Sequence, residues 1–163
     1  MNFRYICVGA IIEPKSDMKD ASFKKLTVAN SVFFDQVKEY LDGGKKVTIP
    51  VAGGSMRPFL RQGDKVVIKA IEPADLKLGR ILLAYTPQGY VLHRLVRKTA
   101  QEVWLAGDAN LQQLERIPKA ALWAVVIEAY RGDKRKNPYA MSTMLAAWLW
   151  YGARPLRRII SKY

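Results

Sequence analysis

The segment "ILLAYTPQGYVLHRLVRK", residues 81–98, holds two apolar runs separated by a short stretch that contains Pro87 and Gly89. Proline and glycine in such a position mark a turn, and short runs rich in branched and aromatic residues are typical of strands. In the second run, side chains alternate between the two faces of a strand. One face then carries Val91, His93 and Leu95, and the other carries Leu92, Arg94 and Val96. The segment therefore predicts two strands with a turn between them.

The same pattern of short apolar runs and Gly or Pro turns extends on both sides of this segment. Six strands without long helices between them favour a compact antiparallel β-domain over a parallel α/β sheet. We therefore expect a mainly β fold. The candidate strands are Val47 to Val51, Lys65 to Ala70, Ile81 to Tyr85, Tyr90 to Lys98, Glu102 to Ala106 and Leu122 to Tyr130.

A helix is expected before the first strand, because apolar residues recur at helical spacing in residues 30–42. Asn30 can cap its start and Gly43 its end. This helix is too short and too charged to span a membrane. The predicted organisation is an N-terminal extension at 1–29, a β-domain with its leading helix at 30–131 and a basic amphipathic tail at 132–163.

Composition excludes several kinds of site. The chain of 163 residues has one cysteine, Cys7, and one histidine, His93. A single cysteine cannot form an intramolecular disulfide, and a single histidine rules out a multi-histidine metal site. We therefore expect no metal and no cofactor. No secretory signal peptide is evident, so the chain is expected to lie in the cytoplasm.

The tail concentrates positive charge in a chain of formal net charge +13, which indicates an anionic partner. Residues 131–163 carry eight Lys or Arg and one acidic residue, Asp133. Residues 137–153 are uncharged but barely long enough to span a bilayer, which favours helices lying at the membrane surface. We expect residues 134–163 to bind an anionic membrane, with simple packing on the β-domain as the alternative. The apolar residues at helical spacing are Met141, Met144, Leu145, Trp148, Leu149, Leu156, Ile159, Ile160 and Tyr163.

Two side chains are suited to covalent chemistry. Ser55 follows Gly53 and Gly54, which allow a sharp turn that leaves a backbone N–H free to face a carbonyl oxygen. A serine hydroxyl needs a neighbouring base, and histidine is the residue type that most readily accepts a proton near neutral pH. His93 is placed on an apolar strand face. The pair suggests nucleophilic catalysis, although each residue alone is more often structural.

The motifs "GGSMRPFLRQGD", "YVLHRLV" and "AGDAN" occur in an order that resembles the peptidase S24/S26 group of signal peptidases and LexA-like repressors. The resemblance covers about half of the chain and implies a coiled, mostly antiparallel β-fold. It also implies that Ser55 is the nucleophile, that His93 is the general base of the histidine branch and that Asp108 supports the site. Gly54, Ser55 and Met56 then form the substrate and oxyanion region.

The resemblance therefore implies a serine endopeptidase of signal-peptidase type that cleaves an extended peptide or leader segment and is peripheral to a membrane. It departs from the usual pattern in lacking an anchor just before the serine motif. One alternative is a catalytically silent module that binds a peptide by strand addition. A nucleic-acid-binding protein is the other, but the basic residues cluster in an apolar tail, so no nucleic-acid partner is expected.

Overall fold

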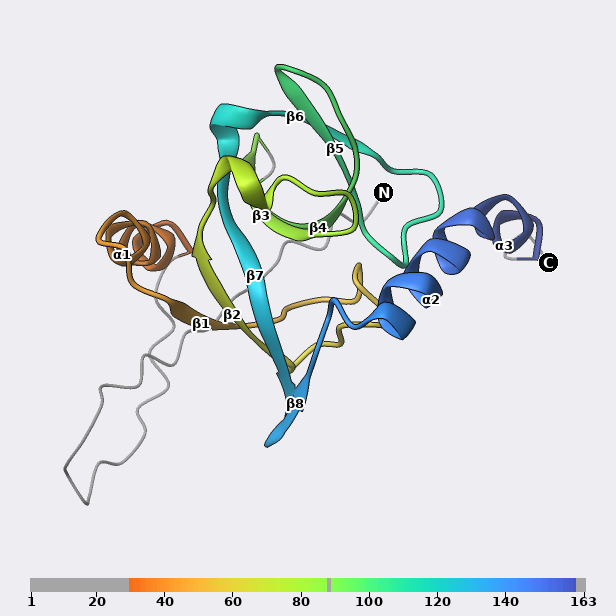
Figure 1. Cartoon of the computed structure of the whole chain (residues 1–163), viewed down its shortest axis with the longest axis horizontal. Helices are drawn as coiled ribbons and strands as arrows, with labels where there is room; N and C mark the ends of the chain where they lie inside the picture. Colours follow the sequence, from red (N-terminus) through yellow and green to blue (C-terminus); the bar gives the residue numbers. More distant parts are fainter. Residues whose placement is uncertain (1–29, 88, 161–163) are drawn as a thin grey trace.

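The computed structural model describes residues 30–87 and 89–160, so the predicted extension at 1–29 with Cys7 lies outside the described residues. Eight antiparallel strands form one strongly coiled sheet, with a helix at one side and two helices at the other (Figure 1). The mainly β prediction is confirmed. The strands are β1 (Val47–Pro50), β2 (Lys65–Ala70), β3 (Ile81–Thr86), β4 (Gly89–Lys98), β5 (Glu102–Ala106), β6 (Glu115–Pro118), β7 (Leu122–Arg131) and β8 (Lys134–Lys136).

The order of strands in the sheet is β1-β2-β7-β3-β4-β5-β6, and β8 pairs with β7. The long strand β7 is central, since it pairs with β2, β3 and β8. The six predicted strands are present with bounds close to those expected. Strands β6 and β8 were not predicted, because they read ERIP and KRK and carry too few apolar residues for an alternating pattern. The sheet therefore continues to Lys136, past the predicted end of the β-domain.

The coiled sheet encloses two apolar clusters. Leu83 of β3 and Leu92 of β4 belong to the first, which also takes in the buried residues of the first helix, α1 (Asn30–Asp42). Leu82 of β3 and Leu95 of β4 belong to the second cluster. Strand alternation thus divides the interior, as the period-two pattern requires. The helix residues in the first cluster are Phe33, Phe34, Val37 and Leu41.

Helix α1 ends at Asp42 as the sequence predicts, but the glycine that reverses the chain lies one residue later than the expected Gly43. The N–H of Gly43 still donates to the carbonyl of Glu39, whereas Gly44 adopts a φ of 71°. That left-handed conformation suits glycine because it has no Cβ. Gly44 and not Gly43 therefore reverses the chain into β1.

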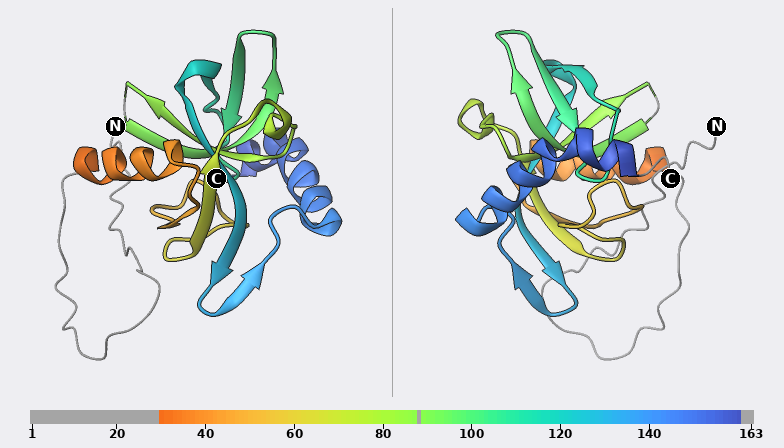
Figure 2. Two further views of the ribbon diagram at one scale, coloured as in Figure 1. Left: turned by 60° about the vertical axis from the view of Figure 1, so that its left-hand side comes forward. Right: turned by 90° about the vertical axis from the view of Figure 1, so that its right-hand side faces the viewer.

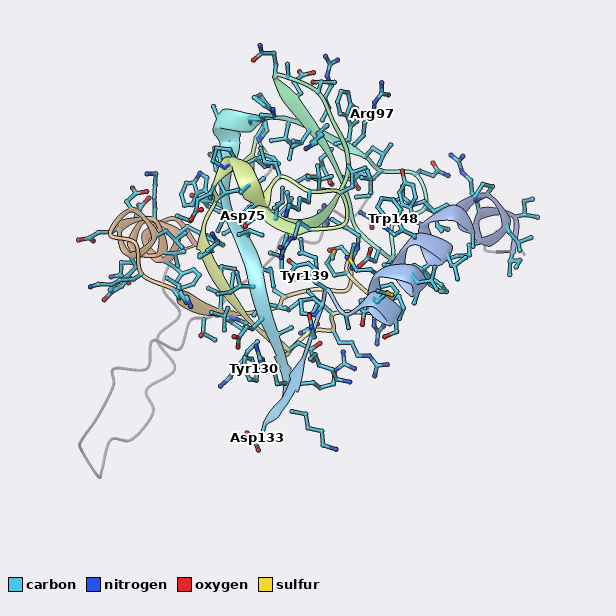
Figure 3. The ribbon with its side chains drawn as sticks, viewed as in Figure 1. Asp75, Arg97, Tyr130, Asp133, Tyr139 and Trp148 are labelled. Carbon is cyan, nitrogen blue, oxygen red and sulfur yellow. The ribbon has the colours of Figure 1, made fainter. Side chains whose placement is uncertain are left out.

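Two C-terminal helices, α2 (Met141–Gly152) and α3 (Arg154–Ile160), run along the side of the sheet opposite α1 (Figures 1 and 2). Tyr139 ties the segment before them to the sheet: its hydroxyl donates to the carbonyl of Val126 and accepts from the N–H of Ile81. Figure 3 shows Tyr139 over the middle of the sheet. Burial raises the pKa of Tyr139, which keeps the hydroxyl neutral for both bonds.

Candidate active site

The loop that carries the serine motif, residues 51–64, is closed at its base by backbone hydrogen bonds. The N–H of Val51 donates to the carbonyl of Asp64, and the N–H of Gly63 donates to the carbonyl of Val51. Arg131 on β7 then pairs with the Asp64 carboxylate at 2.8 Å and donates to the carbonyl of Phe59. We call residues 51–64 the serine loop. Gly63 and Asp64 thus form the predicted turn into β2.

Asp64 is buried, and burial alone raises a carboxyl pKa. Here the hydrogen bonds from Arg131 and from the N–H of Arg61 outweigh burial and lower the pKa of Asp64. The carboxylate therefore stays ionised and holds both ends of the loop, a structural task.

Ser55 stands at the tip of the serine loop with its reactive groups unengaged. Its hydroxyl and its N–H have no hydrogen-bond partner among residues 30–87 and 89–160, and the hydroxyl is not sealed from solvent. Its carbonyl accepts from the N–H of Ala109 at 2.8 Å. Gly107 lies so close that a Cβ there would be 2.7 Å from that carbonyl oxygen. Only glycine at 107 allows this approach of the two loops.

The other two residues of the predicted oxyanion region have different positions. Gly54 is exposed, and its carbonyl accepts from the N–H of Arg57 in the turn. The Met56 side chain is 2% exposed and belongs to the first apolar cluster, where it anchors the loop. The N–H of Met56, like that of Ser55, has no acceptor in the part of the chain that the structure describes. These two backbone groups are available to a substrate oxygen.

His93 on β4 has a carboxylate partner that the sequence pattern did not predict. Its Nδ1 lies 2.6 Å from Oε2 of Glu115 on β6, and both side chains are nearly buried. A carboxylate only accepts, so Nδ1 carries a proton, and in the neutral ring Nε2 then keeps its lone pair. Nε2 has no partner within the described residues and is not sealed from solvent. His93 is thus oriented as a general base would be.

Asp108, which the family resemblance implies as a supporting residue, makes no hydrogen bond with His93 among the described residues. Both carboxylate oxygens accept from Arg94, at 2.8 Å each, and Arg94 also donates to the carbonyl of Gly79. Arg94 is 2% exposed, so its charge requires this partner. The Asp108 carboxylate therefore neutralises Arg94, and its residue belongs to the loop that touches Ser55.

Ser55 and His93 are not joined by a hydrogen bond in the structure. The loop of Ser55 meets the end of β5, where Gly107 follows Ala106, and Ala106 pairs with Arg94 next to His93. Leu92, however, lines the same pocket as Ser55, and His93 projects from the opposite face of β4. Ser55 therefore borders the face of β4 opposite to the one that carries His93, and the two residues do not form a closed catalytic pair.

An apolar pocket adjoins Ser55. It lies between α1, the serine loop, β1, β3 and β4, and its free space is small, about 20 Å³. Tyr90 forms one wall and stacks on Phe34 with ring centroids 3.6 Å apart. Burial, with the nearby Asp35 charge and Tyr85, raises the pKa of Tyr90 to about 12, so this wall stays neutral. The lining residues are Phe34, Ile49, Pro50, Val51, Ala52, Ser55, Met56, Leu83, Tyr90 and Leu92.

The pocket lies beside a strand edge without a described partner. Strand β5 pairs with β4 only from Arg94 onward, so residues 89–93 pair with β3 alone among the described strands. The N–H of Leu95 donates to the carbonyl of Arg80, and paired and unpaired positions alternate along antiparallel strands. The backbone groups of Tyr90 and Leu92 therefore point away from β3.

Strand β1 supplies a second open edge on the other side of the pocket. Among the described strands it pairs with β2 alone, and the N–H of Val51 donates to the carbonyl of Asp64 on that side. By the same alternation, the carbonyl of Pro50 and the backbone groups of Thr48 point away from β2. An extended peptide placed at either edge would meet unpaired donors and acceptors.

No group of three or more metal-binding side chains occurs in residues 30–87 and 89–160. The sequence was compared with known protein families and with curated proteins, and neither comparison finds a match. The function is therefore argued from the site itself.

Proposed function

We propose that the protein is a serine endopeptidase of signal-peptidase type that cleaves an extended peptide next to a small residue. The observation that carries this proposal is an unengaged Ser55 hydroxyl at a small apolar pocket beside open strand edges. His93, oriented by Glu115, stands on one of those edge strands. The order of motifs that resembles the S24/S26 group is a second, independent support.

The reaction would begin when the peptide adds to the open edge of β4 and places a small side chain in the pocket. Space of about 20 Å³ suits a methyl group or none. The backbone of Tyr90 and Leu92 would supply hydrogen bonds that are independent of the peptide's sequence. The pocket then determines which residue precedes the cut.

In the chemical step, Oγ of Ser55 attacks the scissile carbonyl while Nε2 of His93 accepts the hydroxyl proton. Glu115 keeps the proton on Nδ1 and stabilises the imidazolium. The free N–H of Ser55 donates to the oxyanion, an interaction worth roughly 3 kcal/mol of barrier. Nε2 then protonates the leaving amine. Water, with Nε2 again as base, hydrolyses the acyl-enzyme to the acid and regenerates Ser55.

This mechanism requires Ser55 and His93 to close together when a peptide binds. Catalytic hydrogen bonds are often long or poorly aligned without substrate. The serine loop is fixed at its base by Asp64 and Arg131, Met56 anchors it in the first apolar cluster, and one backbone bond joins Ser55 to Ala109. Closure therefore requires the segment around Ser55 to move relative to these contacts.

The test is mass analysis of a set of extended peptides that vary the residue before the cut among Ala, Gly, Leu and Phe. Wild type should cleave after Ala or Gly, and Ser55→Ala should cleave none of them. Ser142→Ala, which changes an exposed serine of α2, is the matched control and should cleave normally. Cleavage by Ser55→Ala at the wild-type rate would refute the proposal.

One observation favours a second candidate, a peptide-binding module without catalysis. The side chain of His93 faces away from the pocket that Ser55 borders, and no hydrogen bond joins the two residues. If this candidate is right, wild type and Ser55→Ala bind the same peptides with equal affinity and leave their masses unchanged. The same peptide set therefore distinguishes the two functions.

A further inference from the structure

Helices α2 and α3 turn one face toward the β-domain. Trp150 donates from its indole to the carbonyl of Asp108 at 2.8 Å, and Arg154 donates to the carbonyl of Gly107. Met144 packs over Gly79, where a Cβ would lie 2.1 Å from its methyl carbon. Trp148 is on the same side, toward the sheet (Figure 3). The side chains of this inner face, including Trp148 and Trp150, therefore contact the β-domain.

The opposite face is apolar and uncovered. The N–H of Ala153 donates to the carbonyl of Leu149, and the N–H of Arg157 donates to that of Ala153, so the two helices follow each other with little interruption. Residues three or four apart then lie on one side. We call this row the apolar stripe. Its members are Met141, Leu145, Leu149, Leu156, Ile159 and Ile160, each at least 60% exposed.

The exposed large hydrophobic residues are clustered in the apolar stripe. It holds six of the ten large exposed hydrophobic side chains found in residues 30–87 and 89–160. Single exposed apolar residues need no explanation, whereas a continuous row of them indicates an interaction surface. Figure 1 shows α2 and α3 at the outer side of the molecule, and in the right-hand view of Figure 2 they lie across the face turned to the viewer, where a broad surface can reach them.

The charge around the apolar stripe indicates which kind of partner can bind to it. From Lys134 to Ile160 the sequence has six Lys or Arg and no Asp or Glu, in a chain of net charge +13. A second copy docked by two-fold symmetry would bring this unmixed positive segment against itself. An anionic lipid surface carries the opposite charge, and it can bind protruding helices without having a groove of matching shape. Within the described residues, no helix is long and apolar enough to cross a membrane.

We propose that the apolar stripe inserts into the headgroup region of an anionic bilayer, with α2 and α3 lying along its surface. This inference does not depend on the proposed peptidase activity. It refines the expectation from sequence: the tryptophans hold the helices on the domain, and leucine, isoleucine and methionine side chains meet the lipid.

The test is flotation of the full-length protein with vesicles of phosphatidylcholine alone or of equal parts phosphatidylcholine and phosphatidylglycerol. Wild type should float with the anionic vesicles and less so at high salt. Leu149→Ser/Ile159→Ser should lose at least about 10-fold in partitioning, because two large apolar contacts are removed. Leu78→Ser/Leu114→Ser removes two exposed leucines outside the stripe and should float like wild type.

Equal flotation of both double variants, or no flotation of wild type with anionic vesicles, would overturn the proposal. So would a lipid-free dimer of wild type that the stripe variant abolishes, since the stripe would then be a self-interface. Circular dichroism checks that the variants fold. Should the double variant unfold, Met141→Ser carries the test, because Met141 is 88% exposed at the first residue of α2.

Discussion

The imidazole of His93 and the carboxylate of Glu115 meet at 2.6 Å although they are 22 positions apart and belong to strands separated by β5. The contact fixes the ring and leaves Nε2 unengaged. It gives the candidate site a base with a defined proton position, which is the arrangement that a serine nucleophile needs.

Replacing Glu115 by Gln should reduce kcat with a smaller change in KM. The amide can donate to Nδ1 and so favour the tautomer with its proton on Nε2, which cannot accept the Ser55 proton. We expect a loss of about 10²- to 10⁴-fold. Steady-state kinetics on a cleaved peptide measure it. Glu102→Gln, which breaks an exposed pair with Arg116, is the control, and an equal loss in both variants would contradict the role of Glu115.

Gly107→Ala should disturb the site through sterics. A Cβ at this position would lie 2.7 Å from the Ser55 carbonyl oxygen, so the two loops must separate. Stability should fall by about 1–3 kcal/mol, and activity should fall with it. Thermal melting and peptide cleavage measure the two effects. Gly152→Ala, where the added Cβ meets open space, is the control and should change neither quantity. Unchanged melting and activity in Gly107→Ala would show that the close approach of the two loops is not required for stability or activity.

Asp108→Ala should affect stability more than chemistry. It leaves the buried Arg94 guanidinium without its carboxylate, which costs about 3–5 kcal/mol for a buried pair. The rate per folded molecule should fall by less than about 10-fold, because Asp108 makes no hydrogen bond with His93. Urea unfolding and active-fraction kinetics separate the two quantities. A stable variant that has lost most of its kcat would instead support the catalytic role that the family resemblance implies.

Asp64→Asn should change the acid stability of the fold. The folded-state pKa of Asp64 is lowered, so its ion pair contributes stability above the unfolded pKa, and this is lost as pH falls through the folded value. At pH 7 the variant should be less stable by about 1–3 kcal/mol, and the difference should shrink between about pH 5 and 2. Urea unfolding across this range measures it. A difference that is independent of pH would contradict the assignment.

The fold was predictable where strands alternate regularly. Residues 81–98 predicted β3 and β4, because each side chain's face follows from its position in the sequence. Strand β8 was not predictable, since three basic residues carry no apolar pattern and pair only because β7 extends beyond its pairing with β3. The sequence did not show which of the adjacent residues Gly43 and Gly44 takes the left-handed conformation, and the structure places it at Gly44.

The candidate site was predictable in its residue types and not in its contacts. The Gly-Gly-Ser motif and a lone histidine suggested Ser55 and His93. Glu115 could not be found, because it contacts His93 only after β5 and β6 fold back across the sheet. Similarly, nothing local distinguishes an Asp108 that supports a histidine from one that neutralises Arg94.

The central claim is that Ser55 and His93 act as one unit although no hydrogen bond joins them in the structure. The most direct test is kcat/KM for wild type, Ser55→Ala, His93→Ala and the double variant on one cleaved peptide. Residues that act together show non-additive losses. The account predicts that the double variant is no slower than Ser55→Ala alone, and losses that add independently would contradict it.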